Sequence, residues 1–283
     1  CPVRFEDDND YKLKIVEEAP YIAKTSGERN FPWRFFVIAK HEKTLVENEM
    51  VYKLSAPCEL EDYSWVTPGK SSWEWWNPSL YNVGFRVGSN TQTYKYYVDF
   101  AANMGLEYML MDGAWMAAAS DPWTPNPEIN LPEVIQYAMQ RNVKVLLWLS
   151  WLTVEKHFDQ LFARYAMAGI SGLKIDFMER SDQWMVNFYE RVAKEAAKYK
   201  LVVDFHGSFK PAGLVCRYPN VLSYEAVVGM EMGKRCDPSN NIWLPFIRNA
   251  VGPMDFTPGA MCNVHPEENN FDIWTHKNAG ASG

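Results

Sequence analysis

The feature of this sequence that most constrains its fold is an alternation of short apolar segments with helical patterns from about residue 72 onward. The apolar segments are nearly continuous and include LEYMLMD, VKVLLWLSW, GLKIDFM and LVVDFHG. Strands buried on both faces read in this way, and they pair in parallel through right-handed crossovers. Seven such strands over about 185 residues fit a (β/α)8 barrel better than an open doubly wound sheet.

We therefore predict an α/β fold, a (β/α)8 TIM-type barrel over residues 71–283. An eighth unit is not recognisable in the polar tail CNVHPEENNFDIWTHKNAGASG, so the barrel is expected to be incomplete at its C-terminal end. No Gly-rich phosphate loop follows any of the strands, which argues against a nucleotide-binding fold.

Residues 1–70 have a different texture. The segments YKLKIVEEAPYIAK, WRFFVIAK and VENEMVYKL are short, roughly alternating, and rich in β-branched and aromatic residues. This pattern predicts antiparallel strands. Because three strands are few for an independent sandwich, we expect residues 1–70 to be the last part of a β-sandwich domain plus a linker.

Composition removes several classes of function. The chain has 28 Lys and Arg against 35 Asp and Glu, a net charge of −7, and no basic cluster, which argues against nucleic-acid binding. No apolar run is long enough to cross a bilayer. The five cysteines form no CxxC pair, so neither a disulfide framework nor a zinc ribbon is indicated. The oligomeric state cannot be read from the sequence.

Acidic residues stand at the ends of most predicted strands. An acid at any one strand end can simply cap the next helix, at roughly even odds. A whole ring of acids repels itself unless it binds a cation, sugar hydroxyls or a developing positive charge. Cleavage of a glycosidic bond needs one carboxylate and one carboxylic acid at such a rim. The acids are Glu74, Asp112, Asp176, Asp204, Glu225, Glu231 and Asp255.

The stretch GLKIDFMERSDQWMVNFYERVAKEAAKYKLVVDFHGSFKPAGLVCRYPNVLSYEAVVGME, followed by LPFIRNAVGPMDFTPGAM, closely resembles glycoside hydrolase family 97. This resemblance implies an α-glycosidase with a calcium ion. The inverting branch of the family carries a glutamate after strand 5, where this chain has Gly207. The retaining α-galactosidase branch carries an aspartate at the end of strand 4, where this chain has Asp176.

By resemblance, Asp176 is the nucleophile and Glu231 the general acid/base of a retaining enzyme that cleaves terminal α-linked hexose, most like an α-galactosidase. Two alternatives stay open: an inverting α-glucosidase of the same family, and an inactive carbohydrate-binding relative. The resemblance also implies an α-linked oligosaccharide substrate and a periplasmic or secreted location.

The resemblance assigns the calcium ion to Glu225 and Glu231, with Glu18 from the N-terminal region and Glu17 as its alternative. Hard cations take several oxygen ligands, so carbonyls and water would complete the shell.

Three further residues are candidates for binding sugar hydroxyls: Asp112, His206 and Lys174. Lys174 precedes Asp176 by two residues. Because side chains alternate along a strand, the side chains of Lys174 and Asp176 would both face the barrel interior. Asp204 stands two residues before His206 and could instead orient that histidine. Ser181 is the expected cap of the following helix, which would leave Asp176 free for chemistry.

Overall fold

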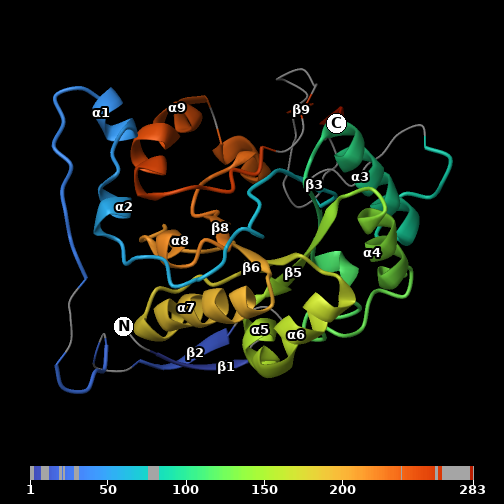
Figure 1. The fold of residues 1–283 in the computed structure, drawn as a ribbon, viewed down its shortest axis with the longest axis horizontal. Helices are drawn as coiled ribbons and strands as arrows, with labels where there is room; N and C mark the ends of the chain where they lie inside the picture. Colours follow the sequence, from blue (N-terminus) through green and yellow to red (C-terminus); the bar gives the residue numbers. More distant parts are fainter. Residues whose placement is uncertain are drawn as a thin grey trace.

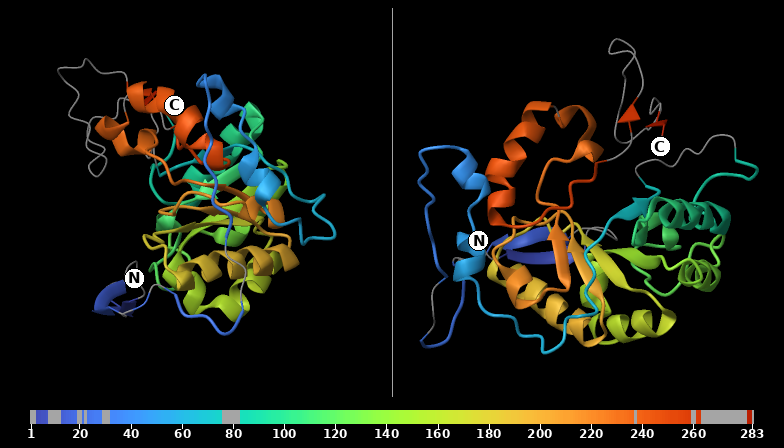
Figure 2. Two further views of the ribbon diagram at one scale, coloured as in Figure 1. Left: turned by 90° about the vertical axis from the view of Figure 1, so that its left-hand side faces the viewer. Right: turned by 45° about the horizontal axis from the view of Figure 1, so that its top comes forward.

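A curved parallel sheet of six strands forms the centre of the molecule (Figures 1 and 2). In this computed structural model the described residues are 3–7, 13–18, 21, 23–28, 32–75, 83–236, 238–258, 261–262 and 281–282. Strand order follows chain order, as in half of a barrel. The strands are β3 (Ser71–Trp73), β4 (Tyr108–Met111), β5 (Lys144–Ser150), β6 (Gly172–Asp176), β7 (Val202–Phe205) and β8 (Val221–Tyr224).

Helices follow the strands and cover the outer face of the sheet. In Figure 1, α3 and α4 lie beyond the β3 edge, while α5, α6 and α7 run along the middle strands. The longer helices are α3 (Thr91–Met104), α4 (Leu131–Met139), α6 (Phe158–Ala168), α7 (Gln183–Lys198) and α9 (Pro238–Ile247). The shorter ones are α1 (Lys43–Val46), α2 (Met50–Leu54), α5 (Trp151–Lys156) and α8 (Leu214–Arg217), with 3-10 turns η1 (Gly113–Trp115), η2 (Met230–Arg235) and η3 (Asn249–Val251).

The ends of these helices follow local sequence. Asn90 accepts a hydrogen bond from the amide of Thr93 at the start of α3, and Gly105 ends the helix with a φ of 66°. At α7 the cap is Asp182, which accepts from the amide of Met185, so the expectation that Ser181 caps this helix is wrong by one residue. Asp176 is still not the cap.

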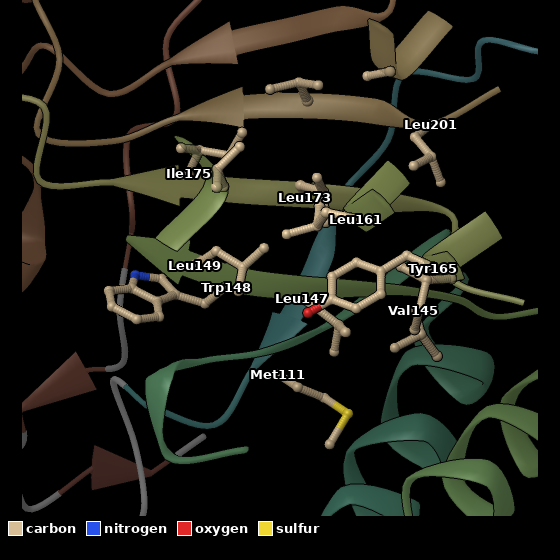
Figure 3. Close-up of a cluster of buried hydrophobic side chains, with 14 of the residues drawn as sticks. Met111, Val145, Leu147, Trp148, Leu149, Leu161, Tyr165, Leu173, Ile175 and Leu201 are labelled. Carbon is tan, nitrogen blue, oxygen red and sulfur yellow. The ribbon is translucent and has the colours of Figure 1, made fainter. Parts of the chain in front are cut away.

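The core lies between the sheet and its helices. Side chains from alternate positions of the strands, such as Leu147, Leu149, Leu173 and Ile175, face α5, α6 and α7 and are fully buried. Figure 3 shows this cluster, with Trp148 at the end toward which the strand arrows point. Burial of this area supplies the main driving force for folding at about 25 cal/mol per Å².

The opposite, inner face of the sheet changes character along the strands. Near the strand starts it is apolar, with Tyr108, Leu110, Leu146 and Val202 in one small cluster. One layer further, the register pairs Trp148 with Lys174 and Lys174 with Asp204. The next layer contains Asp176, paired with Ser150. The strand alternation therefore places polar side chains together at the carboxyl ends of the strands, inside the curve of the sheet.

The N-terminal region differs from the sequence expectation in part. β1 (Val3–Asp7) and β2 (Leu13–Glu18) pair antiparallel, as predicted for that segment. The strands predicted over WRFFVIAK and VENEMVYKL are wrong: residues 32–40 have no regular structure, and α1 and α2 follow. Their alternating aromatic residues have no neighbouring strand to pair with among the described residues, and Phe36 is 93% exposed. The β-sandwich and the domain boundary at residue 70 stay predictions.

The C-terminal region continues the barrel pattern only weakly. The strand predicted at GPMDFTPG is reduced to one parallel bridge, between Tyr224 and Met254. Two short strands, β9 (Met261–Cys262) and β10 (Ala281–Ser282), pair antiparallel. In Figures 1 and 2, α1 lies beside α9, which is far from it in sequence. None of the helices in the described part of the chain is both long and apolar enough to cross a membrane. The six-stranded half-barrel is observed, whereas a closed eight-stranded barrel stays a prediction.

Candidate active site

Ionisable residues follow or end five of the six strands of the sheet at one rim, and Ser150 ends the remaining one. Because the strands are parallel, their carboxyl ends lie at the same edge. The residues are Glu74 after β3, Asp112 after β4, Asp176 at the end of β6, His206 after β7 and Glu225 after β8.

Both carboxylate oxygens of Asp176 accept a hydrogen bond. Oδ1 accepts from the backbone amide of Phe177 at 2.6 Å, and Oδ2 accepts from Nε1 of Trp148 at 2.9 Å. Phe177 has a φ of 63°, an uncommon value for a non-glycine residue. Such backbone conformations concentrate at functional sites, where the surrounding structure enforces them. The two donors fix the plane of the carboxylate while leaving it half-buried.

Gly207 lies directly against this carboxylate. Its φ is 53°, and an ideal Cβ placed there would lie 2.9 Å from the amide nitrogen of Phe177 and 3.1 Å from Oδ1 of Asp176. The Gly207 amide donates to Oε2 of Glu225 at 2.9 Å. The glycine thus allows the ends of β6, β7 and β8 to approach one another closely.

Lys174 and Asp112 form a buried ion pair, with Nζ 3.0 Å from Oδ2. The same Oδ2 accepts from Nε1 of Trp73 at 2.7 Å, and Oδ1 accepts from the amide of Gly113. Burial alone would lower the pKa of Lys174, but the charges of Asp112 and then Asp176 outweigh it and raise the pKa. Lys174 therefore stays a cation. It lies inside the curve of the sheet, on the same strand face as Asp176.

Glu74 contacts Asp112 of this pair and is only 6% exposed. Its Oε1 accepts from the Tyr94 hydroxyl at 2.7 Å and from the Asp112 amide at 3.2 Å. Among the described residues Oε2 has no hydrogen-bond partner. Burial, together with the negative charge of Asp112, raises the pKa of Glu74 to about 8. The side chain is therefore protonated at neutral pH.

His206 is held between acids. Its Nε2 lies 2.6 Å from Oδ2 of Asp255 and 3.2 Å from Oδ2 of Asp204, and its Nδ1 lies 3.5 Å from Oε2 of Glu225. Burial and the charge of Lys174 lower the pKa of His206, but Asp204 and Asp255 outweigh them and raise it well above its usual value. Asp204, His206 and Asp255 also form a group whose ligand atoms lie close enough to hold a metal ion.

Glu231 lies in the turn η2 and is half-buried. Burial raises its pKa to about 7, against the lowering effect of Lys174 and His206, while the charges of Glu225 and Asp112 add to the increase. A carboxyl group with a pKa near neutrality can hold a proton and release it, which is what a general acid/base needs.

The structure brings most of the sequence-predicted residues together at the rim, whereas the side chain of Glu18 lies outside the described residues. Asp112 and Lys174 are in direct contact, and so are His206 and Glu225. Glu231 is close enough to Lys174, His206 and Glu225 for their charges to shift its pKa. Glu18 ends β2, and its side chain, like that of Glu17, is outside the described part of the structure.

Sequence reasoning missed the indole donors. Trp148 stands inside the apolar segment VKVLLWLSW, where it resembles any other core residue. The only usable signal is its register position opposite Lys174, two residues before Asp176. Trp73 donates to Asp112 across the same step between neighbouring strands.

A parallel half-barrel with acids and a buried lysine at its carboxyl rim defines an α/β barrel-type protein with a polar rim site. The model of glycoside hydrolase 97 matches residues 73–227, and that of the glycosyl hydrolase 97 N-terminal region matches residues 4–57. The chain belongs to glycoside hydrolase family 97.

Two curated relatives have similar sequences. A protein named retaining alpha-galactosidase from Bacteroides thetaiotaomicron is 42% identical over 263 residues, which are 90% of this chain and 40% of the relative. A probable retaining alpha-galactosidase from Streptomyces bingchenggensis is 33% identical over 259 residues, 88% of this chain and 39% of the relative. The chain therefore spans about two fifths of the length of these relatives.

Solved structures of similar fold include a member of the same family. A family 97 enzyme from Pseudoalteromonas sp. strain K8 in complex with panose has a TM-score of 0.68 at 26% identity, covering 80% of this chain and 40% of that one. A beta-arabinopyranosidase has a TM-score of 0.63 at 26% identity, covering 77% of this chain and 36% of that one.

Proposed function

We propose that this chain carries the catalytic rim of a retaining α-galactosidase that acts on α-linked oligosaccharides. The observation that carries the proposal is the Asp176 carboxylate, held by two donors at the end of β6 with Gly207 against it. The 42% identity to a relative named retaining alpha-galactosidase supports the same reading.

In the proposed mechanism, Asp176 attacks the anomeric carbon of the sugar while Glu231 protonates the leaving oxygen. Glu231 then takes a proton from water, which releases the sugar from Asp176 with its configuration retained. The raised pKa of Glu231, about 7, supports this double role, since the group must be protonated in the first step and ionised in the second.

The ion pair of Lys174 and Asp112 and the buried His206 would bind sugar hydroxyls. Lys174 carries three N–H donors, of which Asp112 takes one. The fixed positions of these groups would hold the sugar in one orientation before attack.

Glu225 and Glu231 have the chemistry that a calcium ion requires. Both offer carboxylate oxygens, the ligand type that calcium prefers, and they are close enough for the charge of Glu225 to raise the pKa of Glu231. The group around His206 includes a ring nitrogen, and its atoms already bond one another, which suits calcium less. Bound at Glu225 and Glu231, with Glu18 as a further ligand, calcium would supply positive charge beside the sugar hydroxyls.

The retaining assignment is tested with the full chain and p-nitrophenyl α-galactoside. The α anomer should form first by NMR, whereas an inverting enzyme would give the β anomer. Asp176→Gly should be inactive until azide is added, and then yield the β-galactosyl azide. Asp159→Asn, an exposed acid in α6, serves as the control and should behave as the wild type. An absence of turnover at every calcium concentration would favour a carbohydrate-binding relative.

The similarity to a beta-arabinopyranosidase favours one further substrate. A β-L-arabinopyranoside has the ring configuration of an α-galactoside without its hydroxymethyl group. Comparing kcat/KM for the galactoside, the arabinoside and the α-glucoside separates recognition of the axial 4-hydroxyl from recognition of carbon 6. Hydrolysis of the glucoside alone would instead support the α-glucosidase alternative. A periplasmic or secreted location is the remaining part of the proposal and rests on the family resemblance.

A further inference from the structure

We propose that Trp148 is a positioning residue for Asp176, whose indole N–H holds Oδ2 and stabilises the carboxylate each time the covalent sugar ester breaks. This inference rests on the proposed function, because it concerns the second half of the retaining reaction.

The contact between the two residues is built into the sheet. Trp148 on β5 pairs in register with Lys174 on β6, and its side chain reaches one layer further to Asp176, with Nε1 2.9 Å from Oδ2. Trp148 is 3% exposed, so water has little access to its side chain. A hydrogen bond to a charged acceptor in such surroundings is stronger than one between neutral groups.

The indole ring is held in place on several sides. The backbone of Gly113 approaches it so closely that an added Cβ would lie 3.4 Å from the ring. Phe177 meets it edge-on, with ring centroids 5.6 Å apart. The backbone carbonyl of Trp148 accepts from Nε1 of Trp115 at 2.9 Å, which fixes the main chain that carries the ring. A ring constrained in this way presents its N–H in one direction only.

The two oxygens of Asp176 are not equivalent. Oδ1 is held by the backbone amide of Phe177, which no side-chain substitution removes, and Oδ2 by the indole of Trp148. The indole is therefore the adjustable donor. Trp73 and Asp112 repeat the arrangement two strands away, which indicates that the sheet register produces it.

The chemical consequence differs between the two steps. In the first, an Asp176 oxygen bonds to the anomeric carbon, and the glycosidic bond breaks with its electron pair going to the leaving oxygen, which takes the proton of Glu231. In the second, water bonds to the same carbon and gives a proton to Glu231, while the ester bond breaks and its electron pair returns to Asp176. The indole N–H stabilises this returning charge but gains nothing from the charge that attack removes.

The test is Trp148→Phe, which keeps an aromatic ring and removes the donor. With an activated nitrophenyl α-galactoside, kcat should fall about tenfold or more, whereas kcat/KM, which reports the first step, should fall much less. KM should fall together with kcat because the covalent intermediate accumulates. A burst of nitrophenol and a hexose adduct on the intact protein should accompany this change. Trp151→Phe, a buried tryptophan that packs against Trp184 and Phe188, should keep wild-type kinetics.

A second measurement needs neither activity nor the folding of Trp148→Phe. The indole N–H proton of Trp148, observed by NMR in the full chain, should move upfield in Asp176→Asn because a charged acceptor becomes neutral, while that of Trp151 stays in place. An unmoved Trp148 resonance, or equal losses in kcat and kcat/KM without a burst, overturns this inference alone. A wild-type chain that hydrolyses no glycoside overturns the proposed function and with it the catalytic part of this inference.

Discussion

Gly207 and Asp176 are so close that a Cβ on the glycine would lie 3.1 Å from Oδ1 of the aspartate. The glycine also adopts a φ of 53°, in the region that other residues avoid. The chain can therefore keep the carboxylate of Asp176 in place only while position 207 has no side chain. This contact is a physical reason why an aspartate at position 176 and a glycine at position 207 occur together.

We expect Gly207→Ala to lower both stability and activity. The left-handed backbone should cost about 1–2 kcal/mol, and the contact with Phe177 and Asp176 should add to this. Because the added methyl group displaces the carboxylate, kcat should fall about tenfold or more. Urea unfolding and steady-state kinetics measure the two effects.

Gly105→Ala is the matched control. Gly105 ends α3 with a φ of 66°, and nothing lies within 4 Å of an added Cβ. Gly105→Ala should therefore lose only the stability that the left-handed backbone costs, and it should keep full activity. Equal losses of stability in the two variants, with activity retained in both, would show that the contact between positions 207 and 176 is unimportant.

The sequence predicts the sheet because each strand's apolar run reports burial on two faces. Period and length alone identify β5 and β6, and Asp176 is visible because it ends the apolar run of β6. The same reasoning fails at residues 33–40 and 46–54, where an alternating pattern has no strand beside it among the described residues. Alternation shows that a strand is compatible with the sequence, while formation of the strand also needs a partner.

The site is less predictable than the sheet because its contacts depend on register. Trp148 cannot be distinguished from the neighbouring core residues until its pairing with Lys174 is known. The acids that surround His206 come from β7, from the residue after β8 and from the segment after α9, and Asp255 is 49 residues away in sequence. Sequence spacing does not reveal such a pair, whereas Asp204 could be linked to His206 because both are on one strand.

Glu74 should make the stability of the protein depend on pH. Its pKa is raised to about 8 by burial and by the charge of Asp112, whereas in the unfolded chain it is about 4.5. Between these values the folded state binds a proton that the unfolded state lacks. The free energy of unfolding should therefore fall as pH rises from about 5 to about 8, by a few kcal/mol, roughly 1.4 per pH unit.

Glu74→Gln removes this titration while Oε1 can still accept from Tyr94 and from the amide of Asp112. Urea unfolding at four pH values between 5 and 8 should give a flatter profile for the variant than for the wild type. Glu133→Gln, at an acid in the first turn of α4, should leave the slope unchanged. Parallel profiles for wild type and Glu74→Gln would mean that Glu74 is ionised in the folded protein.

Arg248 should stabilise the end of β8. The guanidinium is 5% exposed and donates to the carbonyls of five residues on two segments: Tyr224, Glu225, Ala226, Gly252 and Pro253. Burial lowers its pKa, yet the carbonyl oxygens solvate the charge. The side chain thus joins the segment that carries Glu225 to the one that carries Asp255.

Arg248→Met should lose about 2–4 kcal/mol of stability, because it leaves buried carbonyls without a donor. Hydrogen exchange at the amide of Asp255, which donates to the carbonyl of Tyr224, should become faster. Arg191→Met breaks a partly exposed ion pair with Glu155 and should cost less than about 1 kcal/mol. If Arg248→Met were no less stable than this control, the five bonds would have no net effect.

The alkaline limb of activity should report Glu231. Since the proposed acid must be protonated in the first step, kcat/KM should fall as pH rises through the pKa of Glu231. Burial raises that pKa to about 7, and calcium bound to the same carboxylate would lower it. The positive charge of Lys174 lowers this pKa, second only to the raising effect of burial. Lys174→Met should therefore move the limb to higher pH, besides lowering kcat/KM through weaker sugar binding.

The measurement is a pH profile of kcat/KM at one calcium concentration, with each variant scaled to its own plateau. Lys95→Met, which removes a lysine that pairs with Glu133 on the outer helices, should leave the limb in place. With a dinitrophenyl galactoside, whose leaving group needs no proton, Glu231→Gln should retain turnover in the first step and show no alkaline limb. A limb that persists in Glu231→Gln, or one that Lys174→Met moves to lower pH, would assign the titration to another group and remove Glu231 from the role of acid.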